Sequence, residues 1–440
     1  MLNLAFGAAV AAALHCVTPS ALAQEVNSEA DDLAEDTSQA QLLTTRLNDV
    51  ITVLVGDVEA QAVFAPSFLA AVTPEQLAGL IQQLEQQFGK LEGVESVTPT
   101  GPYSANIALR FENAIGRGTM HLAPDGEHLV VGLLLSDFET LNDTPEAIEA
   151  ELESLPGMVS VLYTPLDGWA DPVIALNPDK QMAIGSTFKL YVLSALARRV
   201  AEGRNGWDQG VRLSVRSLPS GRMQNWPEQT PVTVATLAIM MISISDNTAT
   251  DQLIDLIGRD TVEREVLASG HSQPDRMLPF LTTLELFALK GDEARGGLYA
   301  MANEEQQQDM LADLGRETGG DAANIIPPTF ARPHAIDTLE WFASAQDVRG
   351  ILERIKALDE PIARKILAVN PSVPGPMRDK WAYIGFKGGS EPGVLNLSWL
   401  LQDDTGEWHV LVMSWNNPEE DVDKQKFELL GLRIMGLARR

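Results

Sequence analysis

Apolar and polar residues follow two different periods in the first third of the chain. Apolar residues recur at helical spacing between residues 42 and 57, and Thr73-Pro74-Glu75-Gln76 is a capped helix start that predicts a second helix ending near Gly89. Four stretches then alternate with the period of a strand, with a turn at 124–126: 94–98, 105–111, 118–122 and 128–135. Helices followed by a meander of strands predict a small α+β domain over residues 42–140.

In the second part of the chain, strand patterns occur at both ends and helical patterns fill the middle. The predicted strands are 158–163 and 172–176 at one end and 381–386, 394–401 and 408–415 at the other, and a last helix is predicted over 421–437. This order predicts one α+β domain over residues 158–440 whose two ends pair in a single sheet. The Glu-rich segment 141–157 is predicted to be a connector helix between the two domains.

Residues 1–41 follow neither pattern. Residues 2–14 form an uncharged apolar run that is shorter than the about 20 residues needed to span a bilayer, and Ala21-Leu22-Ala23 is a small-x-small site. These features predict a signal peptide over residues 1–23 and an exported protein, periplasmic or secreted; lipidation of Cys16 and a buried N-terminal helix are the alternatives. Residues 24–41 contain six acidic and no basic residues, which predicts an acidic disordered linker.

Composition narrows the class of protein. The 440 residues are 45% hydrophobic and 21% charged, as in globular proteins. There are 32 basic and 61 acidic residues, a net charge of −29, which argues against nucleic acid or an anionic membrane as partner. The single cysteine excludes an internal disulfide, a cysteine-rich zinc site and a CxxC pair, and the six histidines show no metal-ligand spacing. We therefore expect neither a metal nor a cofactor, and no stable insertion into a membrane.

The segment 185–189, Gly-Ser-Thr-Phe-Lys, directly follows a predicted strand and opens an apolar helix. Ser186 and Lys189 are three residues apart and therefore share one face of that helix. Ser186 lies at the positive end of the helix, where a developing anion is stabilised. A desolvated lysine loses its proton and can then take one from the serine. Among the ten lysines of the chain, only Lys189 has a serine three positions before it.

Two further motifs lie downstream. Ser245-Asp246-Asn247 interrupts a long helical pattern between 233–244 and 248–257. A serine there can pass a proton to a leaving group, and an asparagine can hold a carbonyl or an amide. Lys387-Gly388-Gly389 ends a strand near the C-terminus, where the lysine can attract a carboxylate and the glycines let a substrate backbone lie close to the strand. Each motif by itself is compatible with a helix cap, a turn or a strand end.

In this order, the three motifs resemble those of the penicilloyl-serine hydrolase superfamily, most closely class A β-lactamases, which carry S-x-x-K, S-D-N and K-[ST]-G. The resemblance covers about residues 158–440, including Thr282-Thr283, and implies an antiparallel sheet plus a helical subdomain. The order of elements in 42–140 resembles the NTF2-like cone fold. The two-domain layout is similar to the β-lactamase-like proteins of clavulanic acid biosynthesis that have an NTF2-like N-terminal domain.

The resemblance implies a role for each motif residue. It makes Ser186 the acylated nucleophile and Lys189 its base, with Ser245 in proton transfer. Asn247 would position the substrate, Asp246 would be structural, and Lys387 would bind the substrate carboxylate. Gly388 and Gly389 would lie along the substrate backbone, and the N–H groups of Ser186 and Ser390 would form the oxyanion hole.

The sequence departs from the family pattern at two points. Gly388 replaces the usual hydroxyl residue between lysine and glycine, and Ser390 is the candidate to supply that hydroxyl. The loop glutamate that deacylates class A enzymes is missing, because residues 268–275 contain no Glu and the loop is short. Glu285 is the weak candidate to replace it. An additional polar and Pro-rich segment, 291–333, is predicted to cover or reshape the cleft.

The sequence thus predicts an exported active-site serine hydrolase, acylated at Ser186 by a β-lactam or a related ester or amide, with doubtful deacylation. Two alternatives remain open: a penicillin-binding receptor or pseudoenzyme that is acylated without efficient turnover, and an esterase. The predicted partner is a small molecule of the β-lactam, ester or peptidoglycan-amide type. The sequence does not identify a protein partner.

Overall fold

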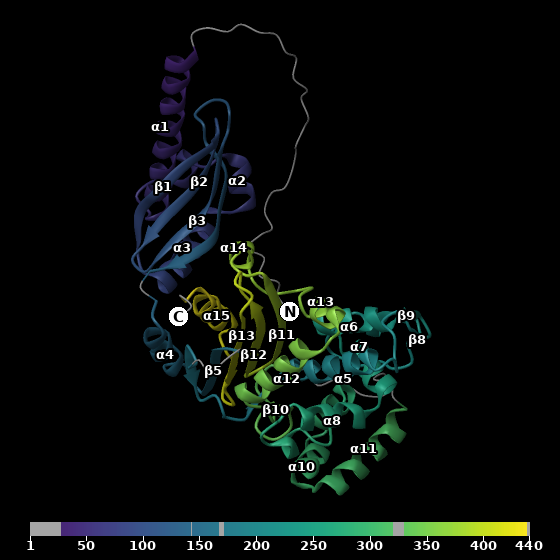
Figure 1. Cartoon of the computed structure of the whole chain (residues 1–440). Coiled ribbons are helices and arrows are strands. Elements are labelled where there is room, and N and C mark those ends of the chain that lie inside the picture. Colours follow the sequence, from purple (N-terminus) through teal and green to yellow (C-terminus); the bar gives the residue numbers. More distant parts are fainter. Residues whose placement is uncertain (1–27, 142, 167–170, 320–329, 438–440) are drawn as a thin grey trace. The chain divides into compact units, whose positions relative to one another are not determined.

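The computed structural model describes residues 28–141, 143–166, 171–319 and 330–437, and it divides into two compact units, 1–143 and 144–440 (Figure 1). The predicted signal peptide, 1–23, lies outside the described residues. The predicted α+β class is confirmed in both units, since each combines helices with an antiparallel sheet. Among the described helices, none is both long enough and apolar enough to cross a bilayer.

The first unit contains helices followed by a four-stranded antiparallel meander in the order β1-β2-β3-β4. Its elements are α1 (Ser28–Leu54), the 3-10 turn η1 (Ala60–Ala62), α2 (Pro66–Ala71), α3 (Pro74–Phe88), β1 (Leu91–Gly101), β2 (Ser104–Phe111), β3 (Ala114–Leu122) and β4 (Val130–Thr140). The predicted helix at 74 begins with the expected capping box between Thr73 and Gln76 and ends at Gly89, whose φ of 77° favours glycine. The helix-then-meander prediction is therefore confirmed, whereas the NTF2-like assignment stays a prediction.

The prediction of a disordered linker over residues 24–41 is wrong from Ser28 onward, because α1 begins there. Leu43, Leu47 and Val50 are fully buried in the first unit. Packing of the C-terminal half of α1, which contains these three residues, stabilises the helix. Further turns can then be added at its N-terminal end without the cost of nucleation.

The second unit is built on a five-stranded antiparallel sheet in the order β11-β12-β13-β5-β6. The strands are β5 (Met158–Pro165), β6 (Ile174–Leu176), β11 (Tyr383–Glu391), β12 (Val394–Gln402) and β13 (Trp408–Asn416). Strand β13 pairs with β5 along its whole length, from His409 opposite Pro165 to Asn416 opposite Met158. The prediction that the two ends of this region pair in one sheet is thus confirmed, and β11 is left at one edge.

Both faces of this sheet are covered. Successive residues of a strand point to opposite faces, and accordingly Leu162 and Val412 belong to one apolar core while Val161 and Leu411 belong to the other. Helices α4 (Pro145–Glu153) and α15 (Lys424–Gly436) pack on one face, and α5 (Lys189–Ala201) and α12 (Ala345–Ala357) lie in the core on the other (Figure 1). Helix α4, predicted as a connector, belongs to the second unit, because Ile148 and Leu152 are fully buried in its core.

The helical part of the second unit lies between β6 and β11 in the sequence. It comprises β7 (Met182–Ala183), η2 (Gly185–Phe188), β8 (Gly210–Arg212), η3 (Met223–Asn225), β9 (Pro231–Thr233), α6 (Val234–Ser243), α7 (Asn247–Ile257), α8 (Arg259–Ala268), η4 (Pro274–Arg276), α9 (Thr283–Gly291), α10 (Glu293–Met301), α11 (Glu304–Thr318), β10 (Phe342–Ala343), α13 (Pro361–Leu367) and α14 (Gly375–Arg378). Helices α10 and α11 lie in the predicted extra segment 291–333; α10 packs beside α9, and α11 packs beside α10. The effect of this segment on a cleft stays a prediction.

Candidate active site

Ser186 and Lys189 lie where the chain passes from β7 through the 3-10 turn η2 into α5. In a 3-10 turn the side chains at i and i+3 eclipse, so the two residues share one face, as predicted. The turn is held by Phe188, whose ring stacks on Trp341 with 3.7 Å between ring centroids and contacts Phe280 edge-on. Ser186 is half-buried, whereas Lys189 is fully buried.

The Lys189 ammonium nitrogen lies against the loop between α6 and α7. Nζ is 3.0 Å from Ser245 Oγ, 2.8 Å from the Ser245 carbonyl oxygen and 2.7 Å from Asn247 Oδ1. Burial lowers the pKa of Lys189 well below its usual range, and the nearby charge of Lys387 lowers it further. The lowered pKa favours the neutral amine, which is the form that can accept a proton from a serine hydroxyl.

Asp246 holds the S-D-N loop in place. Its carboxylate caps α7 by accepting the N–H of Ala249 at 2.9 Å, and it also accepts the N–H groups of Arg222 and Met223 at 2.6 and 2.9 Å. The neighbouring Ser245 has a φ of 57°, a strained value for a residue with a side chain. A fully buried carboxylate with three backbone donors maintains this conformation, which agrees with the structural role expected of Asp246.

Strand β11 contacts the turn that carries Ser186 through Gly389. A Cβ on Gly389 would lie 2.1 Å from the Ile184 carbonyl oxygen and 2.5 Å from the Ser186 nitrogen, so no other residue fits. A Cβ on Gly185 would lie 3.1 Å from the Ser390 nitrogen. The structure therefore brings together the backbones of Ser186 and Ser390, the two residues whose N–H groups were predicted to form an oxyanion hole.

Lys387 lies two residues before Gly389 and shares its face of β11. The side chain is buried and donates to the Gly388 carbonyl oxygen. Burial lowers the pKa of Lys387 to about 7. Gly388 and the exposed Ser390 share the other face of the strand, and the replacement of the missing hydroxyl by Ser390 stays a prediction.

The contacts of Glu285 are with its own helix start and with a neighbouring helix rather than with the motif residues. It forms a capping box with Thr282 and an ion pair with Arg259 at 2.5 Å. The neighbouring Thr283 donates its hydroxyl and its N–H to Asp251, a fully buried carboxylate of α7 that sequence reasoning missed. The Thr282-Thr283 pair thus joins α9 to α7. These contacts weaken Glu285 as a replacement for the loop glutamate.

A buried cluster of Lys290, Glu340 and Glu391 adjoins the site and was also missed. Lys290 Nζ is 2.7 Å from Glu340 Oε1 and 2.5 Å from Glu391 Oε1. Glu391 follows Ser390 and lies on the same face of β11 as Lys387 and Gly389. Burial and the charge of Glu340 raise the pKa of Glu391, so the two carboxyls share one lysine charge. The cluster ties α9 to the end of the strand that contacts Ser186.

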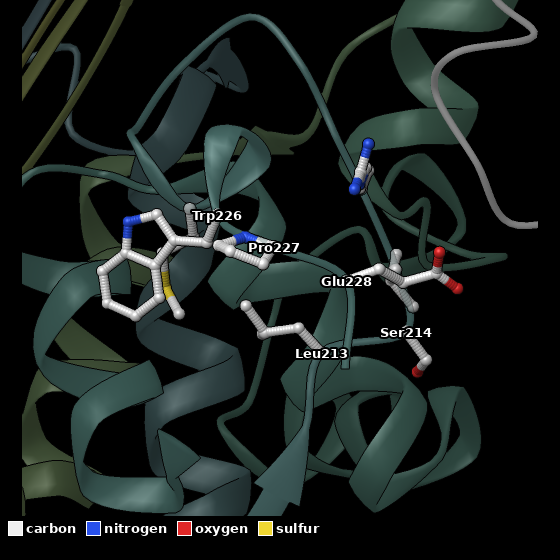
Figure 2. A pocket seen from close by; sticks show the side chains of 8 residues that line it. Leu213, Ser214, Trp226, Pro227 and Glu228 are labelled. Carbon is white, nitrogen blue, oxygen red and sulfur yellow. The ribbon is translucent and has the colours of Figure 1, made fainter. Parts of the chain in front are cut away.

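A small cavity of about 30 Å³ is lined by residues 213–216, Met223 and residues 226–228 (Figure 2). It has room for one or two water molecules, and its lining includes Leu213, Trp226 and Glu228 but neither Ser186 nor Lys189. It is therefore not the place where a substrate would meet the serine.

Residues 144–318 match the profile of the Beta-lactamase enzyme family, a segment that contains Ser186, Lys189 and Ser245 but ends before Lys387. No curated protein sequence matches the chain.

Similar solved structures include a β-lactamase from Sphaerobacter thermophilus (20% identity, 66% of this chain and 94% of the other, TM-score 0.44), a β-lactamase from Chitinophaga pinensis (17%, 67% and 98%, 0.45) and PBP-A (16%, 67% and 96%, 0.45). A PBP-A variant is described as an acyl-enzyme complex with penicillin G.

Proposed function

We propose that the chain is an active-site serine hydrolase of the β-lactamase type that is acylated at Ser186. The main support is the buried Lys189, with its lowered pKa, on the same face of the turn as Ser186 and within hydrogen-bond distance of Ser245 and Asn247. The family match over residues 144–318 supports the same class. The proposed substrate is a β-lactam or a related ester or amide.

The proposed acylation uses the groups just described. Ser186 Oγ attacks the substrate carbonyl while neutral Lys189 takes its proton, and the N–H groups of Ser186 and Ser390 stabilise the oxyanion. Ser245, hydrogen-bonded to Lys189, returns the proton to the leaving nitrogen or oxygen as the carbonyl bond to it breaks. Lys387 attracts the substrate carboxylate. An ester to Ser186 and a protonated leaving group are the products of this half-reaction.

Deacylation requires a second base, and the carboxylates near the motif loops are engaged elsewhere. Glu285 binds Arg259, and Glu265 binds Ser194 and Arg354. These contacts favour a second candidate function, a penicillin-binding receptor that is acylated and hydrolyses its adduct slowly. An esterase would use the same residues.

A chromogenic cephalosporin distinguishes these functions. We expect a burst of colour close to one equivalent, followed by slow release, with an adduct on Ser186 by intact-mass and peptide mass spectrometry. The physical reason is that Lys189 serves acylation while residues 268–275 offer no loop glutamate to activate water. Hundreds of turnovers without a persistent adduct would contradict slow deacylation and establish a β-lactamase. If neither a β-lactam nor an activated ester labels Ser186, the proposed function is wrong.

The pH dependence of acylation should be bell-shaped for a penicillin. The rate constant should rise with pH as Lys189 loses its proton, because only the neutral amine is a base. It should fall above about pH 7 as Lys387 loses the charge that attracts the carboxylate, since its pKa is lowered to about 7. An uncharged ester is the control and should keep the rising limb without the falling one. Identical profiles for both substrates would contradict the role of Lys387.

We also propose that the protein acts outside the cytoplasm after cleavage following Ala23. The support is the apolar run at 2–14 followed by the small-x-small site. N-terminal sequencing of exported protein should start at Gln24, and an intact N-terminus on protein found only in the cytoplasm would contradict export.

A further inference from the structure

His409 is a buried imidazole without a hydrogen bond. It lies near the start of β13, its side chain is only 4% exposed, and neither ring nitrogen has a hydrogen-bond partner among the described residues. The ring is flanked by Tyr163 at 6.2 Å and Trp381 at 5.7 Å between centroids. Because buried polar groups are nearly always satisfied in folded proteins, His409 requires a partner.

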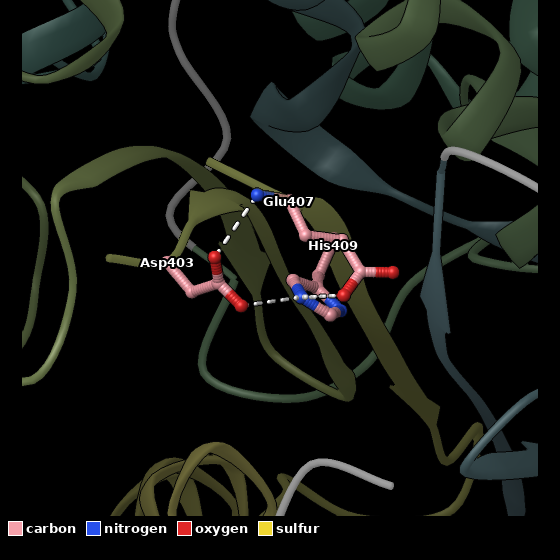
Figure 3. Close-up of side chains that lie close together, drawn as sticks. All are labelled: Asp403, Glu407 and His409. Atoms are coloured by element: carbon pink, nitrogen blue, oxygen red, sulfur yellow. Dashed lines mark hydrogen bonds and ion pairs between the residues drawn. The ribbon is translucent and has the colours of Figure 1, made fainter. Parts of the chain in front are cut away.

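Two carboxylates face this ring from the turn between β12 and β13 (Figure 3). Oδ2 of Asp403 is 3.5 Å and Oε2 of Glu407 is 4.0 Å from His409 Nε2. The other oxygen of Asp403 accepts the Thr405 N–H at 2.9 Å, the Thr405 hydroxyl at 2.6 Å and the Glu407 N–H at 2.9 Å. The turn itself thus orients the Asp403 carboxylate and leaves Oδ2 directed toward His409.

The spacing of these atoms fits a shared cation better than a direct hydrogen bond. Both distances exceed the about 3.2 Å limit of good N–H···O bonds. Two ligands held about 2.1 Å from a tetrahedral zinc ion are about 3.4 Å apart, close to the 3.5 Å between Asp403 Oδ2 and His409 Nε2. The three ligand atoms all lie within 4.8 Å of one another.

We propose that Asp403, Glu407 and His409 bind a divalent transition-metal ion of the Zn²⁺ type. One imidazole nitrogen and two carboxylate oxygens suit zinc, whereas calcium and magnesium take oxygen ligands. Glu407 is exposed at the mouth of the turn, which gives the ion access from solvent and leaves a position for water. The sequence showed no such site because histidine spacing alone does not reveal Asp-x-x-x-Glu-x-His across a hairpin.

The ion would tie the turn to the sheet. His409 is opposite Pro165 of β5, and its ring contacts Trp381, just before β11. The bound ion would therefore stabilise the sheet that carries Lys387 without touching the serine. This site is independent of the proposed hydrolase, and a Ser186→Ala variant should bind the metal unchanged.

The test is a zinc titration of the full chain after removal of metals with a chelator. We expect one equivalent of Zn²⁺ by calorimetry and by elemental analysis, together with a higher unfolding temperature. Glu407→Gln changes an exposed side chain and should fold normally but bind at least roughly tenfold more weakly. His409→Gln should abolish binding.

The matched control is Asp404→Asn, which removes the same charge from the exposed neighbour of Asp403 and should bind zinc as the unaltered protein does. No zinc binding by the unaltered protein would overturn the proposal and leave a His409–Asp403 ion pair. Binding that survives unchanged in both Glu407→Gln and His409→Gln would overturn it as well, because the zinc would then be held elsewhere.

Discussion

A Ser186→Ala variant is expected to form no covalent adduct with penicillin or with an activated ester. Removal of a catalytic nucleophile lowers such rates by a factor on the order of 10⁶, which is below detection by intact-mass spectrometry over hours. The hydroxyl of the half-buried Ser186 is not part of the hydrogen bonds that hold Lys189. The variant should therefore keep its fold, and a circular-dichroism melt should match that of the unaltered protein.

The matched control for this variant is Ser390→Ala. Ser390 is exposed and an alanine there keeps the backbone N–H, so the variant should still be acylated, although more slowly if the Ser390 hydroxyl also contacts the substrate. An adduct that persists in Ser186→Ala would show that another residue is the nucleophile. Loss of the adduct in Ser390→Ala alone would instead assign the reaction to the Ser390 hydroxyl.

A Lys290→Met variant is expected to lose about 3–5 kcal/mol of unfolding free energy. Removing one partner of a buried ion pair leaves the other uncompensated, and here the buried Glu340 carboxylate depends on Lys290, while Glu391 loses a hydrogen-bond donor. The end of β11 should also loosen, which would slow acylation of Ser186. Urea unfolding measures the first effect and the acylation rate measures the second.

Glu391→Gln is the control for the cluster, because the amide keeps the shape and leaves Lys290 paired with Glu340. Glu391→Gln should lower the unfolding free energy clearly less than Lys290→Met does, since the raised pKa of Glu391 already favours the neutral form of this carboxyl. A loss below about 1 kcal/mol in Lys290→Met, the range of a surface pair, would contradict the buried character of the cluster.

Local patterns predicted those elements whose signals are contained in a few residues. The helix at 74–88 has both of its caps in the sequence, and the strands of the second unit alternate clearly. The helix at Ser28 could not be predicted in this way, because its stability comes from packing of Leu43 and Leu47 rather than from its acidic first turns. The position of α4 likewise depends on a core that forms only with distant residues.

The candidate site likewise contains residues that local patterns predicted and residues that only the fold brings together. Motif spacing placed Ser186 and Lys189 on one turn and brought Asn247 and Lys387 into consideration. It did not indicate the cluster of Lys290, Glu340 and Glu391, whose members lie 50 and 101 residues apart and meet only in the fold. The ion pair between Glu285 and Arg259 could not be predicted either, because an ion pair between two helices leaves no local pattern in the sequence.

The pairing of β5 with β13 has a consequence for how the second unit is made. Strand β5 ends at Pro165, but its partner begins only at Trp408, so a chain emerging from the ribosome exposes one side of β5 until residues 166–407 have been made. Pairings between such distant segments close slowly, because the loop entropy is lost before the contacts are gained. The sheet that carries Lys387 is thus completed only after β13 has been translated, and until then β5 is an unprotected edge on which a nascent chain can aggregate.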